Sequence, residues 1–590
     1  MQLEEPGQLR GARALLTHMS MSDTASPWRT AYRHPNAWDT TFPPLSLVEM
    51  FESAATRFGD APLIDFMGRQ YSYRETMDGA NRVACGLAAL GFGPGDRIGL
   101  FLPNAPHYLA AYYGALKLGA IVVNFSPLYS PAELAHQVGD SGTRILFTVS
   151  AKGLLPTALK VLNQSSLERL VVGSIAGALP PAKSLFYRLF KRADIAAAPA
   201  DPRIIAFSAL IANDGACPSP TLDPETSVAL IQYTGGTTGV PKGAMLTHQN
   251  MTANARQVHA ADPEPEQPDR IMGVLPLFHV FANTCVLNRT VHRGGSIVML
   301  PRFDAGQTLA AITRTKATAL PGVPTMYRAL LDHPKVAETD FSSLRVCISG
   351  GAPLPAELKD QFEAATNATL IEGYGLSESS GVLTVNPYAA EGKPGTIGQP
   401  LAGTDLRLVD KEDPSQPAAP GQPGELIAAG PQIMIGYWER PDADADTFVD
   451  DIDGRRWLRT GDVATVDADG FVQIVDRLKD MIAVSGFKVF PSQIEAILYH
   501  HPAVREALVV GLPDAYRGEA PHAYVTLQED AQEDESITGQ ALAAWLNPQL
   551  GRHERVAAVV VRADLPKTMI GKLSRKDLVA QVLAEQAPAA

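Results

Sequence analysis

The sequence lacks several features, and each absence excludes a class of protein. No apolar run approaches the roughly 20 residues that a helix needs to cross a bilayer, which excludes a protein built of membrane-spanning helices. Basic residues are in deficit, with 50 Lys and Arg against 63 Asp and Glu and a net charge of −13. Because a nucleic-acid-binding protein needs a basic footprint, nucleic acid is excluded as a partner. Any anionic ligand must therefore be held by local donors.

Cysteine is also rare, and no two cysteines have the spacing of a metal-binding pair. They are Cys85, Cys217, Cys285 and Cys347. This pattern is typical of reduced thiols in a cytoplasm. The first residues, Met1-Gln-Leu-Glu-Glu-Pro, offer neither a basic start nor an apolar stretch, so they do not resemble a signal peptide. We expect a cytoplasmic protein whose residues 1–25 form a disordered extension, with Met19 and Met21 as alternative start positions.

What the sequence does contain indicates a layered α/β protein. A chain of 590 residues exceeds one hydrophobic core and predicts at least two domains. Leu47–Phe58 has the apolar periodicity of a helix, and Ser46 and Glu49 have the spacing of a capping box at its start. The apolar segments Arg97–Leu102 and Ala120–Asn124 predict buried strands. This alternation predicts a largely parallel sheet with helices on its faces.

The most distinctive segment is Tyr233-Thr-Gly-Gly-Thr-Thr-Gly-Val-Pro-Lys-Gly243, which follows the strand-like run Val228-Ala-Leu-Ile231. Glycines let the backbone approach an anion closely, while N–H groups, hydroxyls and the Lys242 ammonium donate hydrogen bonds. This predicts a polyphosphate site, distinct from a Walker P-loop because Gly243 stands where that motif needs Ser or Thr. A flexible linker is the alternative, and the density of phosphate donors disfavours it.

The loop resembles the signature of the adenylate-forming superfamily, which comprises acyl-CoA synthetases, luciferases and peptide-synthetase adenylation domains. The resemblance extends from about Pro44 to Leu578. Five further segments match in the superfamily's order: Gly373-Tyr-Gly-Leu-Ser-Glu378, Arg459-Thr-Gly-Asp462, Asp476-Arg-Leu-Lys-Asp480, Ser485-Gly-Phe-Lys-Val-Phe-Pro491 and Pro566-Lys-Thr-Met-Ile-Gly-Lys572. Gly235, where the superfamily usually has serine, is a variant found in bacterial long-chain fatty-acid–CoA ligases.

The resemblance implies an α/β fold with a large N-terminal domain of two layered α/β sheets plus a small β-barrel. A small mobile α+β lid domain follows it. We expect residues 26–475 to form the AMP-binding and acyl-binding domain, 476–580 the lid and 581–590 a frayed tail. Lys411–Pro423, with four prolines, predicts a surface turn, and the acidic, proline-rich segment Asp262–Asp269 is interpreted as a solvated connection.

The resemblance also assigns residues to ATP and Mg²⁺. The phosphate loop contributes Thr234, Gly235, Gly236, Thr237, Thr238, Gly239 and Lys242. Two glycine turns form the adenine pocket: Gly350, Gly351 and Ala352, and Glu372, Gly373, Tyr374 and Gly375. Tyr374 is expected to stack on adenine, Asp462 to accept both ribose hydroxyls and Glu378 to bind Mg²⁺. Without the resemblance, these three would be interpreted as a core aromatic, a turn cap and a solvated carboxylate.

Four residues are implied to act on the reacting groups: Lys572, His279, Arg477 and Ser377. Lys572 would place a point charge between the carboxylate and the α-phosphate in the transition state. Lys567 and Lys576 lie nearby, and Lys572 is preferred because the superfamily's lysine follows glycine. Arg477 reaches ribose and phosphate, or forms a surface ion pair. The hydroxyl of Ser377 replaces that of the usual threonine at the phosphate.

His279 stands in an apolar stretch and is implied to orient the carboxylate, with a structural core histidine as the alternative. From Ile271 to Phe303 the sequence has no Asp or Glu. An amino-acid-activating domain carries an acid near this position, since a buried unpaired ammonium is costly. Its absence favours an apolar acyl chain.

Two further positions concern movement of the lid. Lys479 matches the hinge of the superfamily, and Ser485, Gly486 and Phe487 resemble the loop that lines the pantetheine tunnel. The implied function is an ATP-dependent long-chain fatty-acid–CoA ligase that uses Mg²⁺ and coenzyme A and proceeds through acyl-AMP. The alternatives are a CoA ligase for aryl, dicarboxylic or medium-chain acids, an acyl-AMP ligase that loads a carrier protein, and an inactive acyl-binding membrane scaffold. A homodimer is left open.

One segment stands out in this acidic chain: Lys183-Ser-Leu-Phe-Tyr-Arg-Leu-Phe-Lys-Arg192 carries four basic and five apolar residues. On a helix, the apolar ones form a stripe consisting of Leu185, Phe186, Leu189 and Phe190. Such a helix either contacts the anionic inner face of the cytoplasmic membrane or packs on the body of the protein through its stripe. The sequence leaves both interpretations open.

Overall fold

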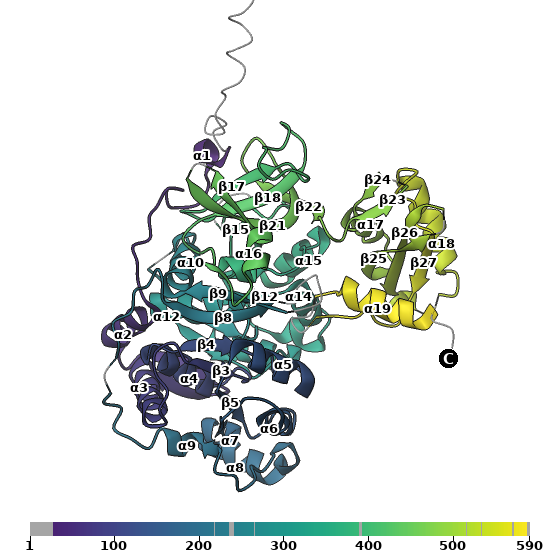
Figure 1. Cartoon of the computed structure of the whole chain (residues 1–590). Helices are drawn as coiled ribbons and strands as arrows, with labels where there is room; N and C mark the ends of the chain where they lie inside the picture. The colour runs from purple at the N-terminus through teal and green to yellow at the C-terminus, as the bar shows by residue number, and fades with distance from the viewer. Residues whose placement is uncertain are drawn as a thin grey trace, which may run out of the picture.

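The computed structural model describes residues 27–217, 219–234, 241–264, 266–388, 392–452, 454–485, 487–514, 516–532, 534–568 and 572–586. A large N-terminal body and a small C-terminal domain lie side by side (Figure 1). Four β-sheets are described, three in the body and one in the small domain. Within the described residues, no helix combines the length and apolarity that crossing a bilayer requires.

The first sheet has nine strands, in the spatial order β16 (Gln399–Pro400), β15 (Thr384–Val385), β14 (Thr369–Tyr374), β13 (Val346–Ser349), β12 (Ala319–Gly322), β10 (Arg270–Gly273), β11 (Ser296–Met299), β1 (Pro62–Phe66) and β2 (Arg69–Ser72). The strands from β14 to β1 pair in parallel. Antiparallel strands close both edges.

The second sheet has eight strands, in the order β19 (Gly436–Tyr437), β9 (Lys242–Thr247), β8 (Val228–Thr234), β4 (Ile121–Asn124), β3 (Arg97–Leu100), β5 (Ile145–Val149), β6 (Arg169–Gly173) and β7 (Ile204–Ala206). From β8 to β7 the pairing is parallel. Strand β9 pairs antiparallel with β8, so the predicted phosphate loop connects two hydrogen-bonded neighbours.

Helices join these two sheets into one layered body. The longer ones are α2 (Leu47–Phe58), α3 (Tyr73–Ala89), α4 (Pro106–Lys117), α5 (Pro131–Ser141), α6 (Leu155–Gln164), α8 (Pro181–Phe190), α10 (His248–Ala260), α13 (Ala305–Thr315), α14 (Pro324–Leu331) and α15 (Ala356–Thr366). Shorter ones are α1 (Trp28–Ala31), α7 (Ile175–Ala178), α9 (Phe207–Leu210), α11 (Val280–Ala282), α12 (Arg289–Arg293) and α16 (Pro441–Thr447). Apolar residues of both sheets and of α2, α3, α4 and α10 form one continuous core. The predicted layered α/β architecture is confirmed.

Short-range sequence patterns correctly predicted several of these helices and strands. Helix α2 has the predicted bounds, and its capping box is present, with the Glu49 N–H donating to Ser46 Oγ at 3.0 Å and the Ser46 N–H to Glu49 Oε2 at 3.0 Å. The predicted strands at Arg97 and Ala120 correspond to β3 and β4 with slightly shorter bounds.

The third sheet occupies the place of the predicted β-barrel. Its strands are β17 (Asp405–Val409), β18 (Gly424–Ala429), β21 (Arg455–Val466), β20 (Phe448–Ile452) and β22 (Val472–Arg477), all antiparallel. Within the described residues its pairing stays open, because no ladder joins β17 to β20 or β22. The segment between β17 and β18 forms the predicted turn.

The small domain follows the segment 478–481 and has its own core. Its sheet contains β24 (Phe487–Val489), β23 (Ile482–Val484), β26 (Gly518–Leu527), β25 (Val504–Asp514) and β27 (Ala558–Val561). Helices α17 (Pro491–Leu498), α18 (Gly539–Leu546) and α19 (Arg575–Gln586) complete it. Helix α19 continues to Gln586, so the chain remains helical beyond residue 580, where we expected a frayed tail. Residues 1–26 and 587–590 lie outside the described residues.

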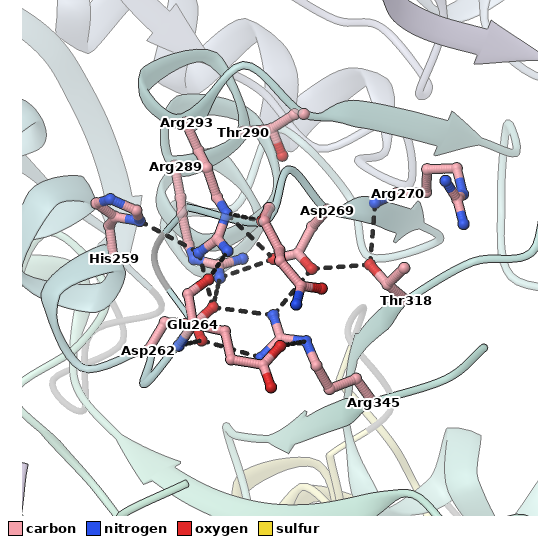
Figure 2. Close-up of polar contacts among 12 residues, drawn as sticks. His259, Asp262, Glu264, Asp269, Arg270, Arg289, Thr290, Arg293, Thr318 and Arg345 are labelled. Carbon is pink, nitrogen blue, oxygen red and sulfur yellow. Dashed lines mark hydrogen bonds and ion pairs between the residues drawn. The ribbon is translucent and has the colours of Figure 1, made fainter. Parts of the chain in front are cut away.

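The interpretation of Asp262–Asp269 as a solvated connection is wrong for its two ends. Asp262 and Asp269 are only 1% and 2% exposed, and they anchor a buried charge cluster (Figure 2). Arg289 donates to both carboxylates, at 2.8 and 2.9 Å, and Arg345 to both, at 2.9 and 3.0 Å. Arg293 donates to Asp262 at 2.7 Å. The two aspartates at the ends of the loop therefore serve as partners for three guanidinium groups of the body.

Candidate active site

The predicted site draws residues from both domains, and it brings Asp462 and Arg477 of the body close to Lys572 of the lid. The carboxyl ends of β8, β13 and β14 supply residues of the body, and β21 and β22 place Asp462 directly opposite Arg477. From the lid, the segment before α19 extends toward the body (Figure 1). That segment is a hairpin in which Lys567 bridges to Leu573, and it carries Lys572.

Asp462 is the centre of the predicted ribose site. It is 2% exposed and sits on β21, where its Oδ1 lies 3.0 Å from Arg477 Nε and its Oδ2 accepts the hydroxyl of Tyr374. Burial and the charge of Asp462 hold the pKa of Tyr374 well above its usual value, so the phenol keeps its proton. Each carboxylate oxygen retains a further lone pair for a ribose hydroxyl. Stacking of Tyr374 on adenine stays a prediction.

The two glycine turns of the predicted adenine pocket need glycine because the backbone is crowded. A Cβ at Gly375 would lie 2.2 Å from the carbonyl oxygen of Gly381, and one at Gly350 would lie 3.1 Å from the ring of Phe281. Gly351 has a φ of +84°, in the left-handed region that favours glycine. Side chains at these positions would therefore fill or distort the turns.

Glu372 ties one turn to the other. Its carboxyl oxygen accepts the Leu354 N–H at 3.2 Å, which joins the end of β14 to the loop that follows β13. Burial raises the pKa of Glu372 to about 8. The side chain is therefore a neutral acid at neutral pH, and it brings no negative charge into the predicted ATP site. Gly373, between Glu372 and Tyr374, is part of the same strand.

The phosphate and metal side is built around Tyr437. Its hydroxyl donates to Glu378 Oε1 at 2.7 Å, and Lys242 Nζ lies 4.5 Å from its ring centroid. Ser377 and Glu378 share a 3₁₀ turn, and Thr234 pairs with Lys242 across β8 and β9. The predicted Gly235, Gly236, Thr237, Thr238 and Gly239 lie outside the described residues.

Glu378 suits Mg²⁺ that is bound mainly by a nucleotide. No group of three or more His, Cys, Asp or Glu within the described residues could enclose a metal ion. Mg²⁺ is commonly held by one or two carboxylates together with water and substrate phosphates. A single carboxylate beside the phosphate loop therefore fits this ion.

His279 caps α11 and is neutral. Its Nδ1 accepts the Phe281 N–H at 3.3 Å, so the ring proton is assigned to Nε2. Burial, with a smaller contribution from the Lys572 ammonium, lowers the pKa of His279 to about 4. Directly after α11, Asn283–Asn288 forms a π-helix, a rare feature that often marks functional sites. No pattern in the amino-acid sequence predicted this π-helix.

Lys572 reaches the body. Burial first, then the charge of Arg477, lowers the pKa of Lys572 to about 8; the Asp462 carboxylate opposes this shift and the Lys479 ammonium adds to it. Its backbone N–H donates to Thr568 Oγ1 at 3.1 Å within the hairpin.

The other two candidate lysines belong to the lid surface. Lys567 pairs with Glu506 at 2.9 Å and with Asp564 at 3.3 Å, and Lys576 is exposed. Among the three lysines, Lys572 is the one that the structure brings to Arg477, Asp462 and His279.

Lys479 lies between two fixed neighbours. The Leu478 N–H donates to the Gly461 carbonyl oxygen of the body at 3.0 Å, while Arg575 of the lid donates to Asp480 at 3.2 Å. Burial and the charge of Arg477 lower the pKa of Lys479. The position fits a hinge, which stays a prediction.

The predicted CoA loop is not brought to the other site residues. Ser485, with a φ of +50°, donates its N–H to the Arg517 carbonyl oxygen at 2.8 Å, and the 60% exposed Phe487 stacks on His553. Both contacts lie within the lid, and Gly486 lies outside the described residues. In the part of the chain that the structure describes, the hydrogen-bond and ring partners of Ser485 and Phe487 all belong to the lid.

Comparison with known proteins settles the family. Residues 51–438 match the profile of the AMP-binding enzyme, and residues 493–572 match that of the AMP-binding enzyme C-terminal domain. The chain belongs to the AMP-binding enzyme family. The sequence-based resemblance to adenylate-forming enzymes is thereby confirmed.

Relatives of this AMP-binding enzyme align over nearly their whole length. A long-chain-fatty-acid–CoA ligase of Bacillus subtilis is 36% identical over 557 residues, which are 94% of this chain and 97% of the relative. One of Escherichia coli O157:H7 is 38% identical over 542 residues, 90% and 94% of the two chains. The solved anthranilate CoA ligase AuaEII with anthranoyl-AMP is 26% identical with a TM-score of 0.80, covering 93% of this chain and 99% of that one.

Proposed function

We propose that this AMP-binding enzyme is an ATP- and Mg²⁺-dependent ligase that joins long-chain fatty acids to coenzyme A. The carboxylate attacks the α-phosphorus of ATP to give acyl-AMP and pyrophosphate, and the thiol of CoA then displaces AMP. One observation carries the proposal: a cluster of cations faces two carboxylates between body and lid. These are Lys242, Arg477, Lys479 and Lys572, with Asp462 and Glu378. The names of the relatives support the long-chain acid.

In the first half-reaction, each site residue has a role that follows from its charge and its hydrogen-bonding groups. The Lys572 ammonium lies between the carboxylate and the α-phosphate and stabilises the charge that develops there. His279, neutral with its proton on Nε2, donates to a carboxylate oxygen and orients the acid. Arg477 and Ser377 hold the α-phosphate, and Asp462 holds the ribose. Glu378 would hold Mg²⁺, which neutralises the outgoing pyrophosphate when bound.

In the second half-reaction, the lid turns about Lys479. This withdraws Lys572 and brings Ser485, Gly486 and Phe487 to the body, where they line the path of pantetheine. The thiol loses its proton and attacks the acyl carbon, the bond between that carbon and the phosphate oxygen breaks, and AMP leaves.

The charges near His279 support an apolar acyl chain over a charged one. The segment Ile271–Phe303 contains no acid, so nothing in it would pair a substrate ammonium. Its buried cations are also occupied: Arg289 and Arg293 are both paired with Asp262. A dicarboxylic acid would therefore find no free buried cation within this stretch of described residues. A medium-chain or aryl acid and transfer to a carrier protein remain the alternatives.

The test is ATP–pyrophosphate exchange with palmitate, octanoate, ferulate, malonate and alanine, followed by addition of CoA. We expect exchange to be greatest with palmitate, to require Mg²⁺, and to be followed by palmitoyl-CoA. Release of ADP and phosphate, or exchange without a carboxylate, would falsify the proposal. A preference for ferulate or malonate would move the protein to an alternative substrate, and failure of CoA to accept the acyl group would favour a carrier.

We also propose that α8 contacts an anionic membrane. The alternative, in which its apolar stripe packs on the body, is wrong because no residue of α8 is buried. Leu185, Phe186, Leu189 and Phe190 are 61%, 56%, 62% and 70% exposed, and the rings of Phe186 and Phe190 lie 4.7 Å apart. Apolar residues flanked by basic ones are typical of helices that lie in a membrane interface. A fatty acid partitions into the same phase.

Sedimentation with vesicles tests this contact. Binding to anionic vesicles should fall with salt and with the double change Phe186→Glu/Phe190→Glu. A wild-type protein that stays in the supernatant at low salt would exclude the contact. If the stripe instead joins two copies of the chain, a dimer should form without lipid and dissociate in the same double variant.

A further inference from the structure

A cavity of about 150 Å³ lies beside α8, outside the site described above. Its lining includes Ser150, Ser174, Tyr187 and Arg188. Ser150 directly follows β5 and Ser174 directly follows β6, two neighbouring parallel strands. The cavity therefore lies along the edge of the second sheet from which the phosphate loop also leaves.

The geometry of α8 couples this cavity to the exposed stripe. At about 100° per residue, Ser184 and Tyr187 fall on the side opposite the centre of the stripe, and both are half-buried against the body. Arg188 falls on the flank between the two sides, where it is exposed and lines the cavity. A membrane surface that receives the stripe would thus lie beside the cavity mouth.

The polar groups at the cavity are donors. Ser150 and Ser174 bring hydroxyls, and burial raises the pKa of the Tyr187 phenol, so it keeps its proton. Arg188 makes no ion pair with any residue that the structure describes, which leaves its planar fork of donors available for a phosphate. Across residues 181–195, four basic side chains stand against one acid, Asp194, whose charge also contributes to the raised pKa of Tyr187.

We propose that this cavity binds the phosphate group of an anionic phospholipid while the stripe of α8 enters the adjacent apolar layer. The inference rests on the membrane contact proposed above and adds the ligand class and its residues. A volume of 150 Å³ exceeds the roughly 30 Å³ that one water occupies in the liquid, so it has room for a phosphate. The stripe favours a lipid over free phosphate, because only the lipid satisfies both features at once.

A matched pair of variants separates a specific pocket from general attraction. Arg188→Gln and Arg192→Gln remove the same charge from neighbouring positions, but only Arg188 lines the cavity. General attraction predicts an equal loss of about fivefold for each in binding to phosphatidylglycerol vesicles. The pocket predicts a loss of about tenfold or more for Arg188→Gln alone, with unchanged thermal unfolding. Equal losses in the two variants overturn the pocket.

A second measurement identifies the source of the phosphate. Hydrogen exchange near Ser150 and Ser174 is followed with dihexanoyl phosphatidic acid, kept below its micelle concentration, and separately with inorganic phosphate. We expect slowing with the lipid at concentrations where phosphate has no effect. Equal slowing by phosphate overturns the lipid as the ligand, and no slowing by either overturns the site.

Failure of this proposal and failure of the ligase assignment give different results. Pyrophosphate exchange with octanoate in the absence of vesicles does not involve α8. It should be unchanged in Arg188→Gln and in Phe186→Glu/Phe190→Glu. Loss of exchange in either variant would show that α8 supports the active site, and would overturn its assignment as a separate lipid site.

Discussion

Two groups of charged residues in this protein contain similar side chains but differ in how completely their charges are paired. The buried cluster of the body consists of Arg289, Arg293, Arg345, Asp262 and Asp269 (Figure 2). The group between body and lid consists of Lys242, Arg477, Lys479, Lys572, Asp462 and Glu378. In the first, every guanidinium donates to a carboxylate at 3.0 Å or less. In the second, cations outnumber acids.

The pKa values reflect this difference. Burial alone would raise the pKa of Asp262, but its bonds to Arg345 and the charge of Arg289 hold it below the usual range. At Lys572 and Lys479, burial and neighbouring cations lower the pKa, so these ammonium groups lack sufficient anions. The first cluster is complete within the protein, whereas the second requires the phosphates of a ligand. The candidate active site therefore differs from the buried cluster in having more cations than carboxylates to pair with them.

The largest expected effect is on stability. Arg289→Met leaves two buried carboxylates short of a partner and should lower the free energy of unfolding by about 3–5 kcal/mol. Arg477→Met removes a 43% exposed side chain from a partly solvated pair and should cost about 1 kcal/mol or less. Urea unfolding followed by tryptophan fluorescence measures both. Equal losses would erase the distinction between the two clusters.

Removal of the Lys572 ammonium should lower the rate of adenylation. In Lys572→Ala, adenylation should slow by about a hundredfold to a thousandfold, which corresponds to about 3 kcal/mol. Thioester formation from supplied acyl-AMP should be spared, because the proposed rotation of the lid withdraws the lysine before that step. The control, Lys576→Ala, changes an exposed lysine four positions further on, in the first turn of α19, and should leave both half-reactions intact. Equal loss of the two half-reactions in Lys572→Ala contradicts the assigned role.

A change at the proposed hinge should affect the two half-reactions in the opposite way. Lys479→Pro fixes φ at the proposed pivot and should leave adenylation intact while overall turnover falls by about tenfold or more. Lys479→Ala removes the charge but keeps the torsional freedom, so it separates the two causes. Single-turnover measurement of each half-reaction decides. Unchanged turnover in Lys479→Pro would place the hinge elsewhere.

The pKa of Lys572, lowered to about 8 by burial and by Arg477, predicts a pH profile. The side chain is charged below that pH and neutral above it. The kcat/KM of adenylation should therefore fall by about tenfold per unit as the pH rises past about 8. Lys572→Arg stays charged, so its residual activity should lack this fall. A wild-type profile that is flat to about pH 10 contradicts the role of the charge.

The smallest expected effect concerns the hydrogen bond that holds Glu378, the proposed Mg²⁺ ligand. Tyr437→Phe removes the 2.7 Å hydrogen bond to Glu378. A lost hydrogen bond of this kind is worth about 1 kcal/mol, so the Mg²⁺ concentration for half-maximal rate should rise by about fivefold. The control is Tyr516→Phe, at a side chain that is 94% exposed. An unchanged Mg²⁺ requirement would show that this hydrogen bond does not support metal binding by Glu378.

The sequence predicted what depends on neighbours along the chain. The cap of α2 rests on Ser46 and Glu49, three positions apart, and the strands before the phosphate loop are marked by their own apolar runs. Motif resemblance extended this to Lys572, whose approach to Arg477 is seen in the structure.

Contacts between distant segments could not be predicted in this way. Asp262 and Arg345 are 83 positions apart, and Glu378 and Tyr437 are 59 apart. A loop rich in acid and proline looks solvated until its partners are known, which is why Asp262–Asp269 was misinterpreted. For α8, the sequence showed the stripe, but only the fold shows which side faces the body.

The proposed hinge also limits how accurately the lid can be aimed. With Asp480 fastened to the lid by Arg575 and the residue before Lys479 bonded to the body, nearly all rotation falls on a very short joint. A small change of angle at this joint becomes a larger displacement at Lys572, because that residue lies far from the joint along the chain. The lid must therefore be rigid where it joins the proposed hinge. Arg575 also donates from Nη2 to both carboxylate oxygens of Glu495, so the residue that follows the proposed hinge is tied through Arg575 to α17 as well as to α19.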